Sequence, residues 1–347
     1  MRRRIGREEA ISLYNEQDMN LLSKMATDIR REINGNRVWY NRNFHLEPSN
    51  VCVHRCSFCS YRRESDLDPG AWTMDFDQIR EYCRRKYEKG MTEVHVVGSV
   101  HPSKDISYYL GIVDIIREEM PPEVTIKAYS AVEIDDMASN SGKPVSEVIE
   151  ELKRRGVSAI PGGGAEIFEN DVRKAICPDK AGSERWLEIH KTAHKAGLRS
   201  NCTMLFGHIE SRENRIDHLL ALRELQDETG GFDAFIPLLY KSANNPMSYV
   251  GEIESLEILK TFAISRIVLD NIPHIKSYWP MLGRDLCQLT LLYGADDIDG
   301  TVNDSTRIYS MAGSDEANPA MTVEELRKLA SGCGFEACER DSFYNEV

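Results

Sequence analysis

The stretch 52-CVHRCSFC-59 places three cysteines within one short segment, in the spacing Cys-x3-Cys-x2-Cys. The chain has nine cysteines, and the others are scattered: Cys83, Cys177, Cys202, Cys287, Cys333 and Cys338. Its first residues, MRRRIGREEAISLYNEQ, lack the apolar core of a secretory signal. An odd number of thiols in such a chain argues against a disulfide framework and predicts a metal or redox centre at 52–59.

The overall composition argues against two classes of partner. Of the 347 residues, 41% are hydrophobic and 29% are charged, and no apolar run approaches the ~20 residues that span a bilayer. The net charge of −13 argues against a general nucleic-acid-binding surface, because phosphate binding needs clustered Lys and Arg. We therefore expect a cytoplasmic protein that binds neither membranes nor nucleic acid.

Strand-like and helix-like segments alternate along most of the chain. Eight apolar or β-branched runs predict strands, at 44–49, 93–99, 124–130, 157–160, 200–207, 233–239, 272–277 and, weakly, 295–300. Helical patterns follow them, at 75–89, 105–119, 145–155, 183–196, 211–228, 252–269, 281–293 and 321–331. Eight such pairs predict an α/β fold, a (β/α)8 barrel of the TIM type, since each helix can return the chain to a parallel strand.

A doubly wound open sheet is the alternative architecture, and it would have a Gly-rich phosphate turn after its first strand. The first predicted strand ends instead in the cysteine loop, and no Pro/Ser-rich linker divides the chain. Apolar residues recur at helical spacing over 7–35, where Asn34-Gly35-Asn36 supplies a stop. We therefore expect an N-terminal helical extension at residues 1–36 and one barrel domain with C-terminal helical elements at residues 37–347.

In such a barrel the chemistry lies at the carboxyl ends of the strands. This rule places the cysteine loop on the active face, together with polar residues of the other loops. They are Ser99, His101, Tyr129, Ser130, Gly162 to Glu166, His208, Glu210, Lys241, Asn244, Tyr278 and Asp296 to Asp299. His190 and His194 lie four positions apart within a helix, without the His-Glu-x-x-His pattern of a zinc site, and are expected on the surface.

Three thiolates in one loop can converge on one metal centre. A structural zinc site would need a fourth protein ligand, and no second cysteine pair lies nearby. His54 could supply that ligand, or could be an exposed loop histidine. Iron–sulfur clusters are held by cysteine thiolates, and a cubane held by only three leaves one iron open for chemistry.

The cysteine spacing, its position after the first strand and the aromatic Phe58 resemble the signature of the radical S-adenosylmethionine (SAM) enzymes. The resemblance implies that Cys52, Cys56 and Cys59 hold a 4Fe-4S cluster and that SAM binds its open iron. It further implies cleavage of SAM to a 5′-deoxyadenosyl radical and a flavodoxin- or ferredoxin-type electron donor. Phe58 is then expected against the adenine or its pocket.

The resemblance extends to other strand ends, with departures. Where the family has a Gly-Gly-Glu-like turn for the SAM amino group, this chain has 98-GSVHP-102. Gly98 and Ser99 are therefore expected to bind that group through backbone carbonyls. Arg173 resembles an arginine that pairs with the SAM carboxylate, a task suited to its planar fork, and a helix-surface position is the alternative.

Three further residues are candidates to contact SAM or substrate. Glu166 lies in a Gly-rich turn at a strand end, where it could instead cap the next helix. Asn201 and Tyr129 could donate hydrogen bonds to the ribose or the substrate. Tyr129 could equally be a core aromatic whose hydroxyl finds a backbone partner.

Four longer stretches are more specific than the cysteine motif. They are 40-YNRNFHLEPSNVCVHRCSFCSYRR-63, 161-PGGGAEIF-168, 200-SNCTMLFGHIESRENRIDH-218 and 226-QDETGGFDAFIPL-238. From Trp39 onward the chain resembles the aminofutalosine synthases of the futalosine route to menaquinone. The dehypoxanthine futalosine cyclase of that route and the tyrosine-using enzyme of deazaflavin cofactor synthesis are similar and stay as alternatives. Residues 41–45, residues 61–63 and the FGHIE stretch favour the synthase.

The resemblance implies a radical addition in which SAM is consumed. The adenosyl radical adds to the enol-ether double bond of 3-[(1-carboxyvinyl)oxy]benzoate, and rearrangement with loss of a carboxylate gives 6-amino-6-deoxyfutalosine and methionine. An iron–sulfur electron-transfer protein is the alternative from another class. It would need a fourth cysteine ligand, such as Cys83 or Cys177.

This substrate is a dianion with an aromatic ring, so basic residues near the strand ends are candidates to bind its carboxylates. They are Arg62, Arg63, His101, His208 and Lys241. The arginines could instead be surface charges, and the histidines could be packing residues. His208 and Glu210, two positions apart, could also form a catalytic acid/base pair that moves protons after the rearrangement.

Overall fold

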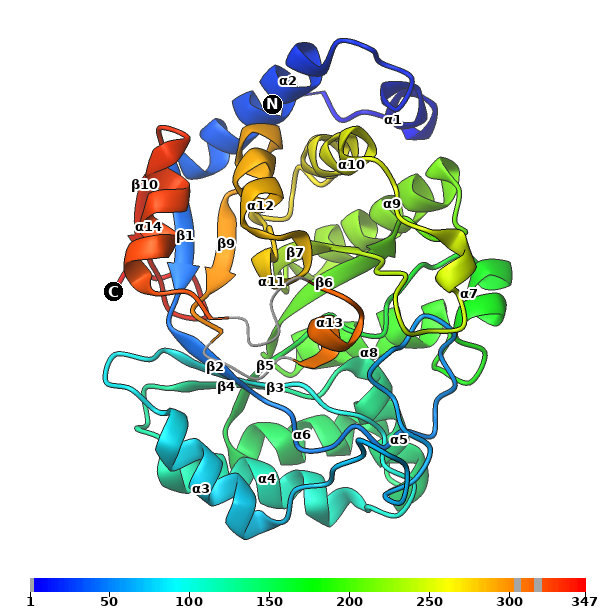
Figure 1. The fold of residues 1–347 in the computed structure, drawn as a ribbon, viewed down its shortest axis with the longest axis vertical. Coiled ribbons are helices and arrows are strands. Elements are labelled where there is room, and N and C mark those ends of the chain that lie inside the picture. Colours follow the sequence, from blue (N-terminus) through cyan, green and yellow to red (C-terminus); the bar gives the residue numbers. More distant parts are fainter. Residues whose placement is uncertain (1–2, 303–306, 315–319) are drawn as a thin grey trace.

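Parallel strands surrounded by helices form a barrel (Figure 1). The computed structural model describes residues 3–302, 307–314 and 320–347. Seven strands pair in chain order into one parallel sheet: β2 (Asn43–Leu46), β3 (Glu93–Val96), β4 (Thr125–Ala128), β5 (Val157–Ile160), β6 (Arg199–Phe206), β7 (Phe232–Leu239) and β8 (His274–Ile275). Three further strands form a second sheet, in the order β10 (Glu336–Glu339), β1 (Arg37–Asn41) and β9 (Asp297–Gly300).

The two sheets together close the barrel. Only Arg42 separates β1 from β2, so this long strand belongs to both sheets. On the other side β9 lies beside β8, where Ser277 N donates to Asp297 O at 2.7 Å and a parallel bridge joins Lys276 to Asp297. β9 then pairs with β1. The circuit from β2 to β9 confirms the predicted (β/α)8 barrel, including the weakly predicted strand near 295–300.

The helices of the chain mostly lie outside the strands, and many connect one strand to the next. They are α1 (Arg7–Leu13), α2 (Met19–Asn34), α3 (Phe76–Lys86), α4 (Ile106–Glu119), α5 (Ala131–Ser141), α6 (Val145–Arg155), α7 (Asn170–Ile176), α8 (Ser183–Lys195), α9 (Arg212–Thr229), α10 (Ser255–Val268), α11 (Trp279–Leu282), α12 (Arg284–Thr290), α13 (Arg307–Met311) and α14 (Val323–Gly332). Local sequence sets several starts, since Asp75 forms a capping box with Gln78 at α3, and Ser211 forms one with Asn214 at α9.

The segment expected as one helix over 7–35 forms two, α1 and α2. The Asp18 carboxylate accepts from the N–H groups of Asn20 and Leu21 and so begins α2 as a new helix. Both helices lie at one end of the molecule, close to α9 and α10 (Figure 1). The apolar face of α2 packs against α10 through Leu22, Ala26, Ile29, Ala263 and Ile267. Among the described residues, no helix has the length and apolar character needed to cross a membrane.

The two histidines of α8 are not surface residues, so that expectation was wrong. His190 is fully buried, with its ring centroid 3.8 Å from that of Trp186 and its Nδ1 3.0 Å from Ser200 Oγ. His194 is half-buried, and its Nε2 lies 2.7 Å from the same hydroxyl. The side of α8 that carries the histidines packs against β6, and both rings contact the Ser200 hydroxyl of that strand.

Candidate active site

A cavity of about 320 Å³ lies at the carboxyl ends of the barrel strands. The cysteine loop and the ends of β3 form one side of it, and the glycine-rich turn after β5 forms another. Apolar lining residues come from β7, α11 and the α13 region, and they are Ile236, Leu238, Leu239, Met281, Ile308 and Ala312. A concave site with one apolar wall and convergent polar groups is what a small-molecule enzyme of this fold requires.

All three clustered cysteines line this cavity as free thiols: Cys52, Cys56 and Cys59. Backbone N–H groups of the loop donate to three surrounding segments, from Cys52 to the Arg63 carbonyl at 2.9 Å, from Val53 to Val100 at 2.9 Å and from Ser57 to Ile176 at 2.7 Å. The loop is therefore held on several sides, and its thiols are directed by the surrounding fold.

The chemistry of these thiols fits an iron–sulfur cluster. Burial raises the pKa of Cys56 to about 12 and also raises that of Cys52, so a bound metal is what would bring them to the thiolate form. Within the described ranges no three His, Cys, Asp or Glu side chains are grouped to hold one metal ion. A cubane makes a different demand, because each cysteine binds its own iron. His54 also lines the cavity, and neither of its ring nitrogens has a hydrogen-bond partner in the described structure.

The part of the wall that follows β3 and β5 is built by close packing around two glycines. A Cβ on Gly162 would lie 2.7 Å from the Cys202 Cα, and one on Gly98 would lie 2.8 Å from Glu133 Oε1. Gly98 thus leaves room for the buried Glu133 carboxylate, which also lines the cavity. Burial raises the pKa of Glu133, and its Oε1 has no partner among the described residues. A ligand with an N–H or O–H group would complete this contact.

Most of the residues predicted to bind SAM line the cavity: Phe58, Gly98, Ser99, Glu166 and Asn201. The Ser99 hydroxyl lies 3.0 Å from the Ser49 carbonyl and 2.7 Å from that of Val51, so it braces the segment before the cysteine loop. Glu166 has a φ of 47° and pairs with Lys180 Nζ at 2.6 Å. The next helix is capped by Glu169 and not by Glu166.

The sequence alone did not indicate Lys180. Its ammonium group lines the cavity beside Glu166, 5.3 Å from the centroid of the Phe58 ring. Burial alone would lower the pKa of Lys180, but Cys56 and Glu166 raise it well above its ordinary value. The residue follows α7 in a loop, and only the folded barrel brings that loop beside the cysteines.

Two other predicted SAM ligands are not brought to the cavity wall. Tyr129 is buried, and its hydroxyl donates to the Tyr109 carbonyl at 2.5 Å. This matches the alternative prediction of a core aromatic residue with a backbone partner. Arg173 is also buried and lies on neither the cavity nor the surface. Its guanidinium donates to the carbonyls of Gly164, Ala165, Ile167 and Ala181. Arg173 therefore holds the turn that contains Glu166.

Two of the predicted substrate-binding residues, Arg62 and Lys241, line the cavity. Arg62 Nε donates to the Cys52 carbonyl at 3.1 Å, and its Nη2 lies 3.0 Å from Glu64. Lys241 Nζ lies 3.6 Å from Glu252, a long ion pair that a ligand could replace.

Arg63 and His101 are directed elsewhere. Arg63 donates to the carbonyls of Ser60, Tyr61, Arg62 and Pro69, so it braces its own loop. His101 is buried and pairs through Nε2 with Asp66 at 3.2 Å. The structure does not bring either side chain to the wall of the cavity.

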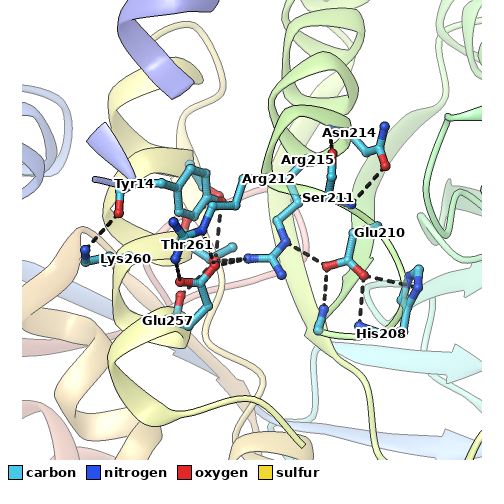
Figure 2. A network of polar contacts seen from close by, with 12 residues as sticks. Tyr14, His208, Glu210, Ser211, Arg212, Asn214, Arg215, Glu257, Lys260 and Thr261 are labelled. Atoms are coloured by element: carbon cyan, nitrogen blue, oxygen red, sulfur yellow. Dashed lines mark hydrogen bonds and ion pairs between the residues drawn. The ribbon is translucent and has the colours of Figure 1, made fainter. Parts of the chain in front are cut away.

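His208 and Glu210 contact each other outside the cavity lining (Figure 2). His208 Nδ1 lies 3.1 Å from Glu210 Oε2, and burial lowers the pKa of His208. Glu210 also accepts from the N–H groups of Gly207 and His208. Its Oε1 pairs with Arg215 at 2.7 Å, and Arg215 continues to Glu257 of α10 at 2.8 Å. The pair thus joins the turn after β6 to a neighbouring helix.

Two histidines that were not predicted as site residues, His45 and His95, also line the cavity and form its floor. Both lie within strands, where side chains normally pack in the core. A signal was present nevertheless, since 43-NFHL-46 and 93-EVHV-96 carry polar residues at alternate positions. That period directs Asn43, His45, Glu93 and His95 to one face, which in this barrel is the interior.

Comparison with known proteins identifies the class. The radical SAM superfamily model matches residues 46–222, so the chain belongs to this superfamily. The CofH/MqnC C-terminal region matches residues 229–346. The chain is 39% identical to the aminodeoxyfutalosine synthase of Thermus thermophilus, over 99% of this chain and 93% of that protein. It is 34% identical to the 5-amino-6-(D-ribitylamino)uracil–L-tyrosine 4-hydroxyphenyl transferase of Methanopyrus kandleri, over 97% of this chain and 91% of that protein.

A solved structure supports the fold. The crystal structure of methylornithine synthase matches with a TM-score of 0.77 and 16% sequence identity, over 96% of this chain and 94% of that one. Membership of the superfamily makes the chain an enzyme, and its cofactors are a 4Fe-4S cluster and SAM. The predicted cluster and cofactor are thereby confirmed, and zinc is not needed to explain the cysteine loop.

Proposed function

We propose that the chain is an aminofutalosine synthase of menaquinone biosynthesis. It joins the 5′-deoxyadenosyl group of SAM to 3-[(1-carboxyvinyl)oxy]benzoate. The adduct rearranges and loses one carboxylate as CO2 or bicarbonate, and the products are 6-amino-6-deoxyfutalosine and methionine. The observation that carries the proposal is 39% identity to the Thermus thermophilus synthase along nearly the whole of both chains. A flavodoxin- or ferredoxin-type protein is the proposed electron donor.

The residues of the chain divide the work between them. Cys52, Cys56 and Cys59 would hold the cluster, which when bound supplies the electron that cleaves SAM. Around SAM the candidate contacts are Phe58, Gly98, Ser99, Glu166 and Asn201. The apolar wall suits an aromatic ring and keeps water from the reacting atoms. Positive charge for a substrate carboxylate is available at Arg62 and Lys241.

The remaining predicted residues act on the site from outside it in this proposal. Arg173 orders the turn that presents Glu166, and Tyr129 supports the end of β4. Arg63 and His101 fix the loops beside the cysteines. His208 and Glu210 order the turn after β6. We therefore assign these residues positioning roles and not direct contacts to substrate.

A second candidate function is the transfer named for the Methanopyrus kandleri relative. Its 34% identity over 97% of this chain makes that reaction the competitor to be tested. It would use L-tyrosine and an aminouracil in place of the enolpyruvyl benzoate. The related cyclase of the futalosine route is a further alternative within the same superfamily.

One set of incubations separates these reactions. The reconstituted, reduced enzyme is mixed with SAM and either 3-[(1-carboxyvinyl)oxy]benzoate or tyrosine with 5-amino-6-(D-ribitylamino)uracil, and the products are identified by mass spectrometry. We expect a nucleoside adduct of the benzoate with one methionine per turnover. Free 5′-deoxyadenosine without an adduct would reject the synthase, and a product from tyrosine would establish the competitor.

A further inference from the structure

The floor of the cavity is polar, where the interior of a barrel is usually filled by apolar side chains. His45 of β2 and His95 of β3 lie opposite each other in the strand register, with ring centroids 4.8 Å apart. Tyr278 lies parallel to His45 at 6.4 Å, and all three line the cavity. We refer to His45, His95 and Tyr278 as the imidazole floor.

Charged residues near this floor are arranged by depth. Lys127 of β4 is the register partner of His95, so a cation stands in the same layer as the imidazoles. Its counter-ion Glu93, 2.5 Å from Lys127 Nζ, belongs to the register layer with Thr125, one layer deeper. Lys276 Nζ is likewise paired, with Asp299 at 2.6 Å. Of these residues only the two histidines line the cavity, and Glu93 lies one register layer deeper.

His95 is the member of the floor that is open to a ligand. Its ring makes no hydrogen bond to any part of the chain that the structure describes, and the ring faces the cavity. Burial lowers the pKa of both His45 and His95, so both rings are neutral at pH 7. His95 is half-buried at the cavity wall, so an acceptor on a bound ligand would complete its N–H group. Because Lys127 stands in the same register layer as His95, the acceptor that suits this position is an anionic oxygen of the ligand.

We propose that the imidazole floor receives the ring carboxylate of an aryl acid substrate. The inference rests on the proposed function and adds the orientation of the substrate. In that substrate the ring carboxylate lies meta to the enol ether, so its placement on the floor directs the enol ether towards the cysteine loop. Ile236, Leu238 and Met281 then flank the ring, and Arg62 beside the loop faces the second carboxylate.

Unreactive probes test this assignment by binding alone. The reconstituted holoenzyme with SAM is titrated with 3-methoxybenzoate and with 3-methoxybenzamide by calorimetry. We expect the wild type to prefer the acid by about tenfold or more, as for a charge-assisted hydrogen bond. His95→Phe keeps an aromatic ring without an N–H group and should lose most of this preference. His194→Gln changes a half-buried histidine outside the cavity and should keep it.

Each other outcome overturns the assignment. Wild-type enzyme that binds acid and amide equally, or floor variants that keep the wild-type preference, would show that the carboxylate lies elsewhere. A floor variant that loses affinity for SAM and not for the probe would assign the floor to SAM. If His95→Phe fails to fold, His95→Leu tests the same subsite. Failure of the synthase reaction is seen separately, as absence of the adduct in wild-type incubations.

Discussion

Cysteines of similar burial differ in this chain by the direction in which they point. Cys56 faces the cavity, whereas Cys177, also buried, does not line it. We expect alanine at Cys52, Cys56 or Cys59 to abolish binding of the cluster, because the iron bound by the replaced cysteine loses its only protein ligand. Cys177→Ala is the matched control and should retain the full iron content. The measurement is iron and sulfide per chain after anaerobic reconstitution, and loss of iron from Cys177→Ala would indicate a four-cysteine cluster.

Lys180 and Glu166 allow a second prediction at the residue scale. Their side chains are 16% and 8% exposed, so Lys180→Gln leaves a nearly buried carboxylate without its cation. We expect a loss of about 3 kcal/mol in the free energy of unfolding of the cluster-free protein, measured with urea. Lys174→Gln removes an exposed pair with Asp171 nearby and should change the stability little.

The double variant Lys180→Gln/Glu166→Gln tests the cause of that loss. It should recover part of the stability, because the uncompensated charge is gone. A single Lys180 variant as stable as the wild type would mean that the ion pair contributes nothing to the fold. In that case Lys180 would remain only as a contact for ligands of the cavity.

Between elements, Arg215 of α9 links Glu210 in the turn after β6 to Glu257 in α10 (Figure 2). Arg215→Met leaves both carboxylates in a nearly dry contact, and we expect a loss of about 3 kcal/mol in the free energy of unfolding. Arg212 on the same helix also pairs with Glu257, but its side chain is 43% exposed. Arg212→Met should therefore cost less than about 1 kcal/mol.

The two variants are compared by urea unfolding under the same conditions. Equal losses for Arg215→Met and Arg212→Met would show that burial does not decide the strength of these contacts. The same network continues to the N-terminal segment, because Lys260 Nζ of α10 donates to the Tyr14 carbonyl at 2.9 Å. Helix α10 therefore ties the turn after β6 to the segment after α1.

Helices and strands could be predicted from the sequence where their own residues show a clear hydrophobic period. Strands β1 and β10 were not predicted, because each pairs with residues far away in the chain and the short run 336-EACE-339 of β10 has a glutamate at each end. Helix α5 was not predicted either, and it directly follows a strand predicted to extend to residue 130. The barrel could be predicted because its repeat is local, whereas its closure by β9 and β1 depends on long-range pairing.

Across the whole molecule, the sequence motif indicated which cysteines lie at the cavity, but it could not indicate which of several similar basic side chains do. Cys52, Cys56 and Cys59 all line the cavity, as their spacing predicted. Arg173 does not, because the carbonyls of its neighbouring turn use its donors. Lys180 does, and no local pattern marks it. Basic side chains near strand ends are numerous, so only the packing of the fold decides which of them line the cavity and which hold neighbouring loops.

The buried histidines give the whole molecule an expected response to acid. Burial lowers the pKa of His218 to about 3 and that of His194 to about 4, so both rings are neutral in the folded state. In the unfolded chain each titrates near pH 6.5, so the unfolded state takes up protons first. The stabilisation is therefore complete above about pH 6.5 and is lost progressively as the pH falls towards 4.

Each such histidine should reduce the free energy of unfolding by about 1.4 kcal/mol per pH unit below pH 6.5. His218→Gln can keep a hydrogen bond to the Thr203 carbonyl, which His218 Nε2 contacts at 2.9 Å, without a titrating ring. Urea unfolding at intervals between pH 7 and pH 5 should therefore show a shallower slope for the variant, by the equivalent of one proton. Identical slopes for the wild type and the variant would contradict the prediction. They would mean that the His218 ring takes up a proton equally well in the folded and unfolded states, despite its packing against Phe168.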